Sequence, residues 1–275
     1  MRRGLSTAAL VLALGVVPTA AQKTGASLET VLDRASDHVE AFIDRFANVV
    51  ADETYRQEMS SPRRKREIKA EFLLVRFPGS AGWRMFRDVY EVDGQPVRGA
   101  EQQGRMLKLF TEPTDNPVRR ANDIMMSGAK YNLRDIGALN QPLMALAFLQ
   151  RDYRPRFRFN LTGSPKSLGA GVRTLHFQEW KTPTLLRAGA NSDLPTSGLI
   201  HVEEATGRVL RTELRYGTSR LPPEVITDYR FDEALGMDVP VAMRDWYPDG
   251  TGDIRGVATY GRFRRFQVAT EERVD

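Results

Sequence analysis

Strict alternation of apolar and polar residues characterises the second half of the chain. Successive side chains of a strand point to opposite faces, so this period-two pattern predicts strands with one covered and one solvated face, as in an antiparallel sheet. The strands predicted in this way are 156–161, 199–203, 208–216, 225–231, 239–247 and 254–268. Their short connections favour one strongly curved antiparallel sheet, a half-barrel, over two separate domains.

The N-terminal part of the chain instead repeats apolar residues at spacings of three and four, from Leu28 to Val49. This period predicts an amphipathic helix over about 27–52, with Ser27 as its N-cap. A helix with one apolar stripe needs a surface to cover. Acidic residues fill its polar face, whereas helices that lie on membranes carry Lys and Arg there, so we expect it to pack on the sheet. The fold class is therefore α+β, with the sheet wrapped around this helix.

Between these regions the pattern predicts three more strands and a helical insert. The strands are 55–59, 68–77 and 83–92, and the insert covers about 98–150. The turn between the first two strands contains the basic run 63–66. Such a run either binds phosphate or lipid headgroups or is a solvated loop tip.

The first residues have the order of a secretory signal peptide. Arg2 and Arg3 precede an apolar stretch at 5–17, which a Pro and small residues follow. Its 13 apolar residues fall short of the roughly 20 that span a bilayer, which disfavours an uncleaved anchor. We expect residues 1–21 to be removed and residues 22–275 to form a single periplasmic or secreted domain.

Composition narrows the chemistry further. The 275 residues include no Cys, which excludes disulfides, thiolate zinc sites and cysteine nucleophiles. The net charge is +5, and removal of Arg2 and Arg3 leaves 38 basic against 35 acidic residues, or +3. That excess is too small to indicate a nucleic-acid partner.

Strand 83–92 has apolar side chains on both faces, which indicates burial on both. Together with neighbouring strands, it supplies more aromatic and Met surface than a single helix packed on the sheet would cover. We expect these side chains to line an apolar hollow on the concave face, although a well-filled core is the alternative. The candidate ligand-binding residues are Phe72, Trp83, Phe86, Tyr90, Trp180, Met243 and Trp246.

Arginines concentrate on the predicted outer face of the sheet, with Arg211, Arg215 and Arg230 as candidates for surface interaction. Such a face could meet an envelope protein, an anionic polymer or lipid headgroups. Because Glu213 and Asp228 are interspersed, an ordinary solvated face is the alternative.

The sequence contains none of the common hydrolase, nucleotide-binding or zinc-protease motifs. His201 with Glu203, or His176 with Glu179, would be the acid–base pair if the protein were an enzyme. The segment 249–253 resembles a calcium loop, but its twelfth position is Tyr260 instead of Glu, so a hairpin turn is expected. We expect no catalytic activity, no metal and no cofactor.

The order of helix, strands, helical insert and consecutive strands resembles the periplasmic outer-membrane lipoprotein carrier (LolA-like) superfamily. The resemblance rests on five segments: 199–202, 206–211, 225–229, 237–241 and 258–263. The chain also resembles a group of uncharacterised secreted bacterial proteins. It departs from the carriers in its length and in its large helical insert.

The resemblance implies a sheet wrapped around helices, with an apolar hollow that takes up an acyl chain. The expected partner is thus a lipid or the acyl chain of a lipoprotein, with peripheral membrane contact. The alternative is an envelope interaction module that binds no small ligand and docks through its arginine-rich face.

Overall fold

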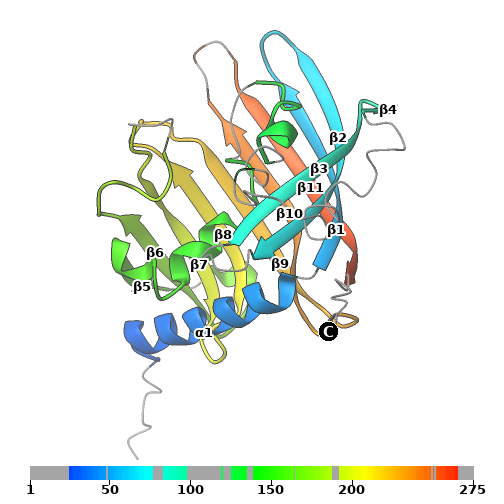
Figure 1. The fold of residues 1–275 in the computed structure, drawn as a ribbon. Coiled ribbons are helices and arrows are strands. Elements are labelled where there is room, and N and C mark those ends of the chain that lie inside the picture. The colour runs from blue at the N-terminus through cyan, green and yellow to red at the C-terminus, as the bar shows by residue number, and fades with distance from the viewer. Residues whose placement is uncertain are drawn as a thin grey trace, which may run out of the picture.

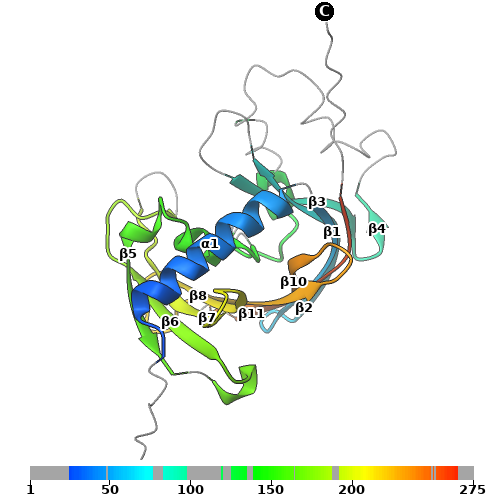
Figure 2. The same cartoon turned by 90° about the horizontal axis from the view of Figure 1, so that it is seen from below.

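The computed structural model describes residues 25–47, 49–76, 83–97, 119, 125–134, 139–163, 165–187, 192–248, 250 and 252–265. In these residues the strands form one 11-stranded antiparallel sheet in the order β4-β3-β2-β1-β11-β10-β9-β8-β7-β6-β5. The sheet curves strongly and does not close, and a helix lies across its concave side (Figures 1 and 2). This arrangement confirms the predicted curved antiparallel sheet.

Neighbouring strands of the sheet are consecutive in the chain at every position but one, and β4 and β5 form its two edges. At that one position β1 pairs with β11, so the first and last long strands lie side by side in the middle of the sheet. The strands are β1 Val49–Met59, β2 Arg64–Arg76, β3 Trp83–Val92, β4 Gln95–Pro96, β5 Phe157–Thr162, β6 Val172–Glu179, β7 Thr196–Glu203, β8 Val209–Tyr216, β9 Glu224–Asp232, β10 Met237–Tyr247 and β11 Ile254–Arg265.

The helix α1, Leu28–Phe46, covers the concave face, as its apolar stripe predicts. Ser27 caps it by accepting a hydrogen bond from the Thr30 amide. Its C-terminal half places Phe42 against Tyr229 of β9 and Phe46 against Phe72 of β2, with ring centroids 6.5 Å and 6.3 Å apart. Because α1 contacts strands on both sides of the β1–β11 junction, it ties the two halves of the sheet together.

The end of the predicted helical insert packs on the same concave face. Residues 125–129 are helical, and the 3-10 helix η2, Met144–Leu149, lies against α1 and β8. The Ser36 hydroxyl donates to the Leu149 carbonyl at 2.6 Å, which joins α1 to η2. Two further 3-10 turns, η3 Arg154–Arg156 and η4 Lys166–Leu168, flank β5. The core thus lies between the sheet, α1 and η2.

The boundary between the first helix and the first strand differs from the prediction. The helix ends at Phe46 instead of continuing to about 52, and β1 begins at Val49 instead of Tyr55. Val49 and Val50 pair with Arg265 and Arg264 of β11, so the start of β1 is fixed by its neighbour in the sheet. Similarly, Arg64 and Lys65, expected in the turn, already belong to β2.

No helix in the described part of the chain is long and apolar enough to cross a membrane. The predicted signal peptide, residues 1–21, lies outside the described residues. So does most of the insert before residue 125. The division into a leader and a single domain therefore stays a prediction.

Candidate functional site

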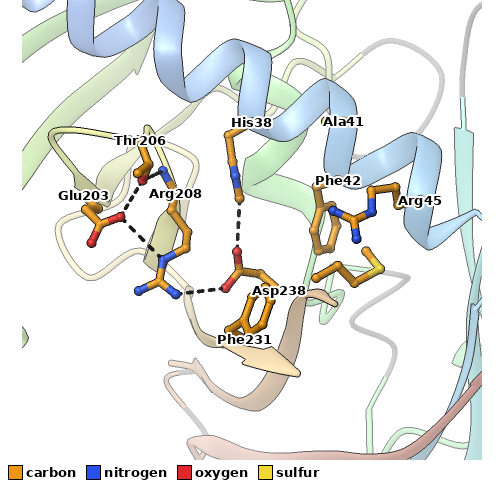
Figure 3. A pocket seen from close by; sticks show the side chains of 10 residues that line it. His38, Ala41, Phe42, Arg45, Glu203, Thr206, Arg208, Phe231 and Asp238 are labelled. Carbon is orange, nitrogen blue, oxygen red and sulfur yellow. Dashed lines mark hydrogen bonds and ion pairs between the residues drawn. The ribbon is translucent and has the colours of Figure 1, made fainter. Parts of the chain in front are cut away.

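A pocket of about 460 Å³ opens where α1 meets the rim of the concave face (Figure 3). One wall is α1, and the others are the β7–β8 turn and the ends of β9 and β10 that join in a hairpin. Its volume falls in the range of about 300–1,000 Å³ that is usual for small-molecule sites. The lining residues are His38, Ala41, Phe42, Arg45, Glu203, Thr206, Arg208, Phe231, Met237 and Asp238.

Local backbone geometry brings the β7–β8 turn against the helix. Gly207 has a φ of +75°, and a Cβ atom there would lie within 2.5 Å of the Ala35 backbone nitrogen. Arg34 also donates from Nη1 to the Glu204 carbonyl oxygen at 2.8 Å. The turn and α1 are therefore in backbone contact beside the pocket, and this contact positions Arg208 at its edge.

The charged groups of the pocket contact each other loosely. Asp238 Oδ2 lies 3.6 Å from His38 Nε2, and Asp238 Oδ1 lies 3.7 Å from Arg208 Nη1. Arg208 Nε is 3.8 Å from Glu203 Oε2. These separations exceed hydrogen-bond length, and both Arg208 Nε and Asp238 Oδ1 are buried with no hydrogen-bond partner among the described residues. A buried donor and a buried acceptor are thus left available at one pocket.

Burial also suppresses charge inside the pocket. It lowers the pKa of His38 to about 4, with the positive charges of Arg208 and Arg45 acting in the same direction. It raises the pKa of Asp238 above its ordinary value, against the effect of Arg208. His38 is therefore neutral at neutral pH, and its contact with Asp238 is not an ion pair. The fixed positive charges of the pocket are Arg45 and Arg208.

Apolar side chains form the rest of the pocket wall. Phe42 comes from α1, whereas Phe231 and Met237 come from the β9–β10 hairpin, where Phe231 pairs with Asp238 across the two strands. Phe231 is 47% exposed, which is high for a large apolar side chain. A wall of this kind together with two arginines suits an amphiphile that has an apolar chain and an acidic head.

The centre of the concave face is polar, in contrast to the expected apolar hollow. Arg87 of β3 binds the carboxylate of Glu53 on β1, and Tyr260 donates to Glu53 Oε1 at 2.9 Å. Beside them, Tyr55 donates to Asp245 Oδ2 at 2.8 Å. Burial raises the pKa of Asp245 to about 7, against this hydrogen bond. These groups lie beneath the described end of the insert, since Arg87 also donates to the Asn140 carbonyl at 3.0 Å.

The seven candidate residues for the hollow do not share one face. Phe72 contacts α1, Met243 Sδ lies 3.8 Å from the Tyr260 hydroxyl oxygen, and Trp83 donates to Gln150 at 2.7 Å, so these three belong to the concave side. Strand register places the other candidates on the convex side. Phe86 is buried there opposite Leu73, Tyr90 lies beside Glu71 and Arg264, Trp180 is 50% exposed near Arg158, and Trp246 lies beside Arg244 and Val257.

The candidate residues of strand 83–92 thus lie on both of its faces. Burial on both faces, as predicted, holds for Met85 and Phe86, which are 4% and 1% exposed. A single ligand in the concavity, however, could not touch all seven residues. Whether Phe72, Trp83 and Met243 contact a ligand stays a prediction.

The arginine-rich outer face is largely neutralised by cross-strand ion pairs. Arg211 Nε lies 2.5 Å from Asp228 Oδ1, and Arg215 Nη2 lies 2.8 Å from Glu224 Oε1. Arg230 is exposed, and no ion pair is seen for it in the residues described. Asp228, one of the acids noted in the sequence, thus pairs directly with Arg211, and Glu224 pairs with Arg215, whereas Glu213 contacts His201. These pairs favour the solvated-face interpretation for Arg211 and Arg215.

The histidine pairs considered for catalysis are not assembled. His201 is 2% exposed and contacts Thr174 and Glu213 at 3.0 Å and 3.1 Å, whereas Glu203 accepts from Thr206. His176 is exposed, while Glu179 is buried against the Leu185 amide. Within the described ranges, no group of three or more His, Asp or Glu side chains is placed to hold a metal ion.

Comparison with known proteins finds similarity at the level of solved structures alone. No protein-family model and no curated protein matches the chain. A DUF1329 family protein from Desulfovibrio piger is 13% identical with a TM-score of 0.40, covering 86% of this chain and 92% of that one. A LolA superfamily protein from Nitrosomonas europaea is 11% identical with a TM-score of 0.37, covering 88% and 95%.

A third similar structure is a putative outer membrane lipoprotein-sorting protein domain from Vibrio parahaemolyticus. It is 14% identical with a TM-score of 0.40, covering 86% of this chain and 95% of that one. A likeness of this degree transfers neither a site nor a ligand, so the interpretation of the pocket rests on its own residues.

Proposed function

We propose that this is an exported, non-enzymatic binding protein that carries a lipid or acyl chain, which enters through the pocket beneath α1. The observation that carries the proposal is the pocket itself. It combines an apolar wall with two arginines and with buried polar atoms that lack partners. The signal-peptide pattern and the sequence resemblance to LolA-like carriers support export and an acyl ligand.

The chemistry of the pocket assigns a part of the ligand to each wall. Arg45 and Arg208 are suited to an acidic head, since guanidinium groups bind carboxylate or phosphate through charge-assisted hydrogen bonds. Asp238 Oδ1 is available to a donor on the same head. The chain lies over Phe42 and Phe231, and each methylene that leaves water contributes about 0.8 kcal/mol.

Burial of a long chain requires movement of the helix. Phe42 and Phe46 already pack on the concave face, and both are at most 4% exposed. The visible pocket is therefore the entrance, and a long chain displaces the C-terminal half of α1 from β9 and β10. No cofactor takes part, because reversible burial involves no bond making or breaking.

Native mass spectrometry of the protein purified without detergent, followed by organic extraction, tests the proposal. The expected result is a bound mass of several hundred daltons that extracts as lipid, or stoichiometric uptake of an added C16 fatty acid. Phe231→Ala is expected to weaken uptake about ten-fold, because it removes exposed apolar wall. Arg230→Ala is the matched control, since Arg230 is the preceding residue on β9 and does not line the pocket.

Two results would overturn the proposal. One is a bare protein mass together with no uptake of fatty acid. The other is an equal effect of Arg230→Ala and Phe231→Ala on fatty-acid uptake, which would show that the ligand does not bind in this pocket.

A further inference from the structure

A second depression, of about 520 Å³, lies around the β1–β2 turn. This turn is at the end of the sheet opposite α1 (Figure 1). Four of its lining residues are basic and two are acidic. The lining residues are Glu58, Met59, Ser60, Arg63, Arg64, Lys65, Asp253 and Arg255. We call this set the basic tip.

The acidic members of the basic tip are already engaged. Glu58 Oε1 accepts from Lys65 Nζ at 2.6 Å, and Asp253 Oδ2 accepts from the indole of Trp246 at 3.0 Å. No ion pair is seen for Arg63, Arg64 or Arg255 in the part of the chain that the structure describes, and all three are exposed. The tip therefore presents three exposed guanidinium groups for which the described residues supply no direct ion pair, and its basic residues outnumber its acidic ones by four to two.

Apolar side chains adjoin Arg255 on the convex face. Trp246 of β10 pairs with Arg255 of β11 in the sheet register, so the two side chains are neighbours on one face. Val257, two residues further along β11, is 51% exposed and lines a shallow apolar depression with Trp246. Arginines beside a partly exposed indole are the combination that suits the boundary between phosphate headgroups and acyl chains.

We propose that the basic tip, with Trp246 and Val257, is a docking surface for the phosphate headgroups of an anionic lipid bilayer. Guanidinium groups bind phosphate oxygens in a bidentate manner, and three of them, two in the β1–β2 hairpin and one at the start of β11, contact several headgroups together. The surface is independent of the pocket beneath α1, which lies at the other end of the strands (Figure 1). It also differs from the Arg211–Arg215 face, where acidic residues on the adjacent strand pair with the arginines.

Vesicle co-sedimentation tests the proposal directly. The full chain is mixed with vesicles of phosphatidylglycerol and phosphatidylcholine, or of phosphatidylcholine alone, at low and at physiological salt. We expect binding to the anionic vesicles that weakens as salt rises, with little binding to the neutral ones. The double variant Arg63→Gln/Arg64→Gln is expected to bind about thirty-fold more weakly, since each basic residue near such a surface contributes about five-fold.

A control variant separates local docking from general charge. Arg230→Gln/Arg265→Gln removes the same charge from two exposed positions at the α1 end of the sheet and is expected to bind like the unchanged protein. The proposal is overturned if both double variants lose binding equally, or if anionic and neutral vesicles bind alike. It is also overturned if inorganic phosphate binds at the tip while vesicles do not, which would indicate a site for a free anion. None of these results depends on whether the pocket beneath α1 binds fatty acid.

Discussion

Arg87 of β3 holds both carboxylate oxygens of Glu53 of β1 on the concave face. Arg87 Nη2 donates to Glu53 Oε1 at 2.8 Å, and Nε donates to Oε2. The Glu53 side chain is fully buried, and that of Arg87 is 10% exposed. This bidentate pair joins β1 to β3 across the intervening strand β2. On β2, Ala70 is the register partner of Glu53 and Phe72 is the register partner of Arg87. The pair therefore fixes how tightly this edge of the sheet curls.

Breaking this pair from one side is expected to be costly. Arg87→Met leaves the Glu53 carboxylate buried without its cation and should lower the free energy of unfolding by about 3–5 kcal/mol. The double variant Glu53→Gln/Arg87→Met should lose less than the sum of the single variants, because no unpaired charge remains. Urea unfolding of the four proteins gives the coupling energy.

The exposed pair Arg56–Glu67 is the control, since it joins the outer faces of β1 and β2 at 2.6 Å. Arg56→Met should change stability by at most about 1 kcal/mol. A cost for Arg87→Met that is no larger than this would contradict the structural role given to the buried pair.

Asp245 should make the protein less stable as the pH rises from about 4 to 7. Burial raises its pKa from the ordinary 3.8 to about 7, so the folded state binds the proton more tightly than the unfolded state does. Its contribution to stability is thus fully present below pH 4 and is lost as the pH passes 7. Asp245→Asn retains an acceptor for the Tyr55 hydroxyl and removes this dependence.

The measurement is the free energy of unfolding in urea at intervals between pH 4 and 8, for both proteins. The difference between them should grow in favour of Asp245→Asn with rising pH and level off above about pH 7. A difference that stays constant over this range would show that Asp245 titrates at an ordinary pKa.

The sequence predicted the sheet well because its outer residues are solvated and its inner residues are mostly apolar. Strand 83–92 was predicted with its observed limits, and the starts and ends of β8 to β10 with errors of at most two residues. The start of β1 was missed because its inward positions include Glu53, which is a buried polar residue. It interrupts the period-two pattern, while the spacing from Phe46 to Val49 continues the helical one.

The sites were less predictable than the fold. Trp180 and Trp246 were assigned to the hollow by residue type, but alternation along their strands, extended from the apolar Phe177 and Met243, would have placed both outside. The pocket beneath α1 was missed because its residues come from three distant segments. His38 and Asp238 are 200 positions apart, and their proximity follows from the way in which α1 crosses the sheet.

Acid should weaken the protein partly through His38. Its pKa falls from the ordinary 6.5 to about 4 in the folded protein, so the unfolded state takes up a proton more readily. The stabilising contribution is present above pH 6.5 and is lost as the pH falls towards 4. His38→Gln should flatten the fall in stability between pH 6.5 and 4, measured by urea unfolding.

The other charged groups of the pocket, Arg45, Glu203, Arg208 and Asp238, are unchanged in this variant, so they serve as the common background. Of these, Asp238 has a raised pKa and acts in the opposite direction as it takes up a proton. Parallel stability profiles for His38→Gln and the unchanged protein would contradict the neutral, buried state of His38.

Gly207 provides a test of the contact between the β7–β8 turn and α1. Both Gly207 and Gly94 have positive φ angles, of +75° and +77°, so an alanine at either position is strained by about 1–2 kcal/mol. Gly94 has open space around the missing Cβ, whereas at Gly207 the Cβ would collide with the backbone of Arg34 and Ala35. Gly207→Ala should therefore destabilise the protein clearly more than Gly94→Ala in urea unfolding, because α1 must move away from the turn.

Since that movement also displaces Arg208 from the pocket, fatty-acid uptake should fall in Gly207→Ala and not in Gly94→Ala. Equal losses of stability in the two variants would show that the backbone contact does not hold α1 in place.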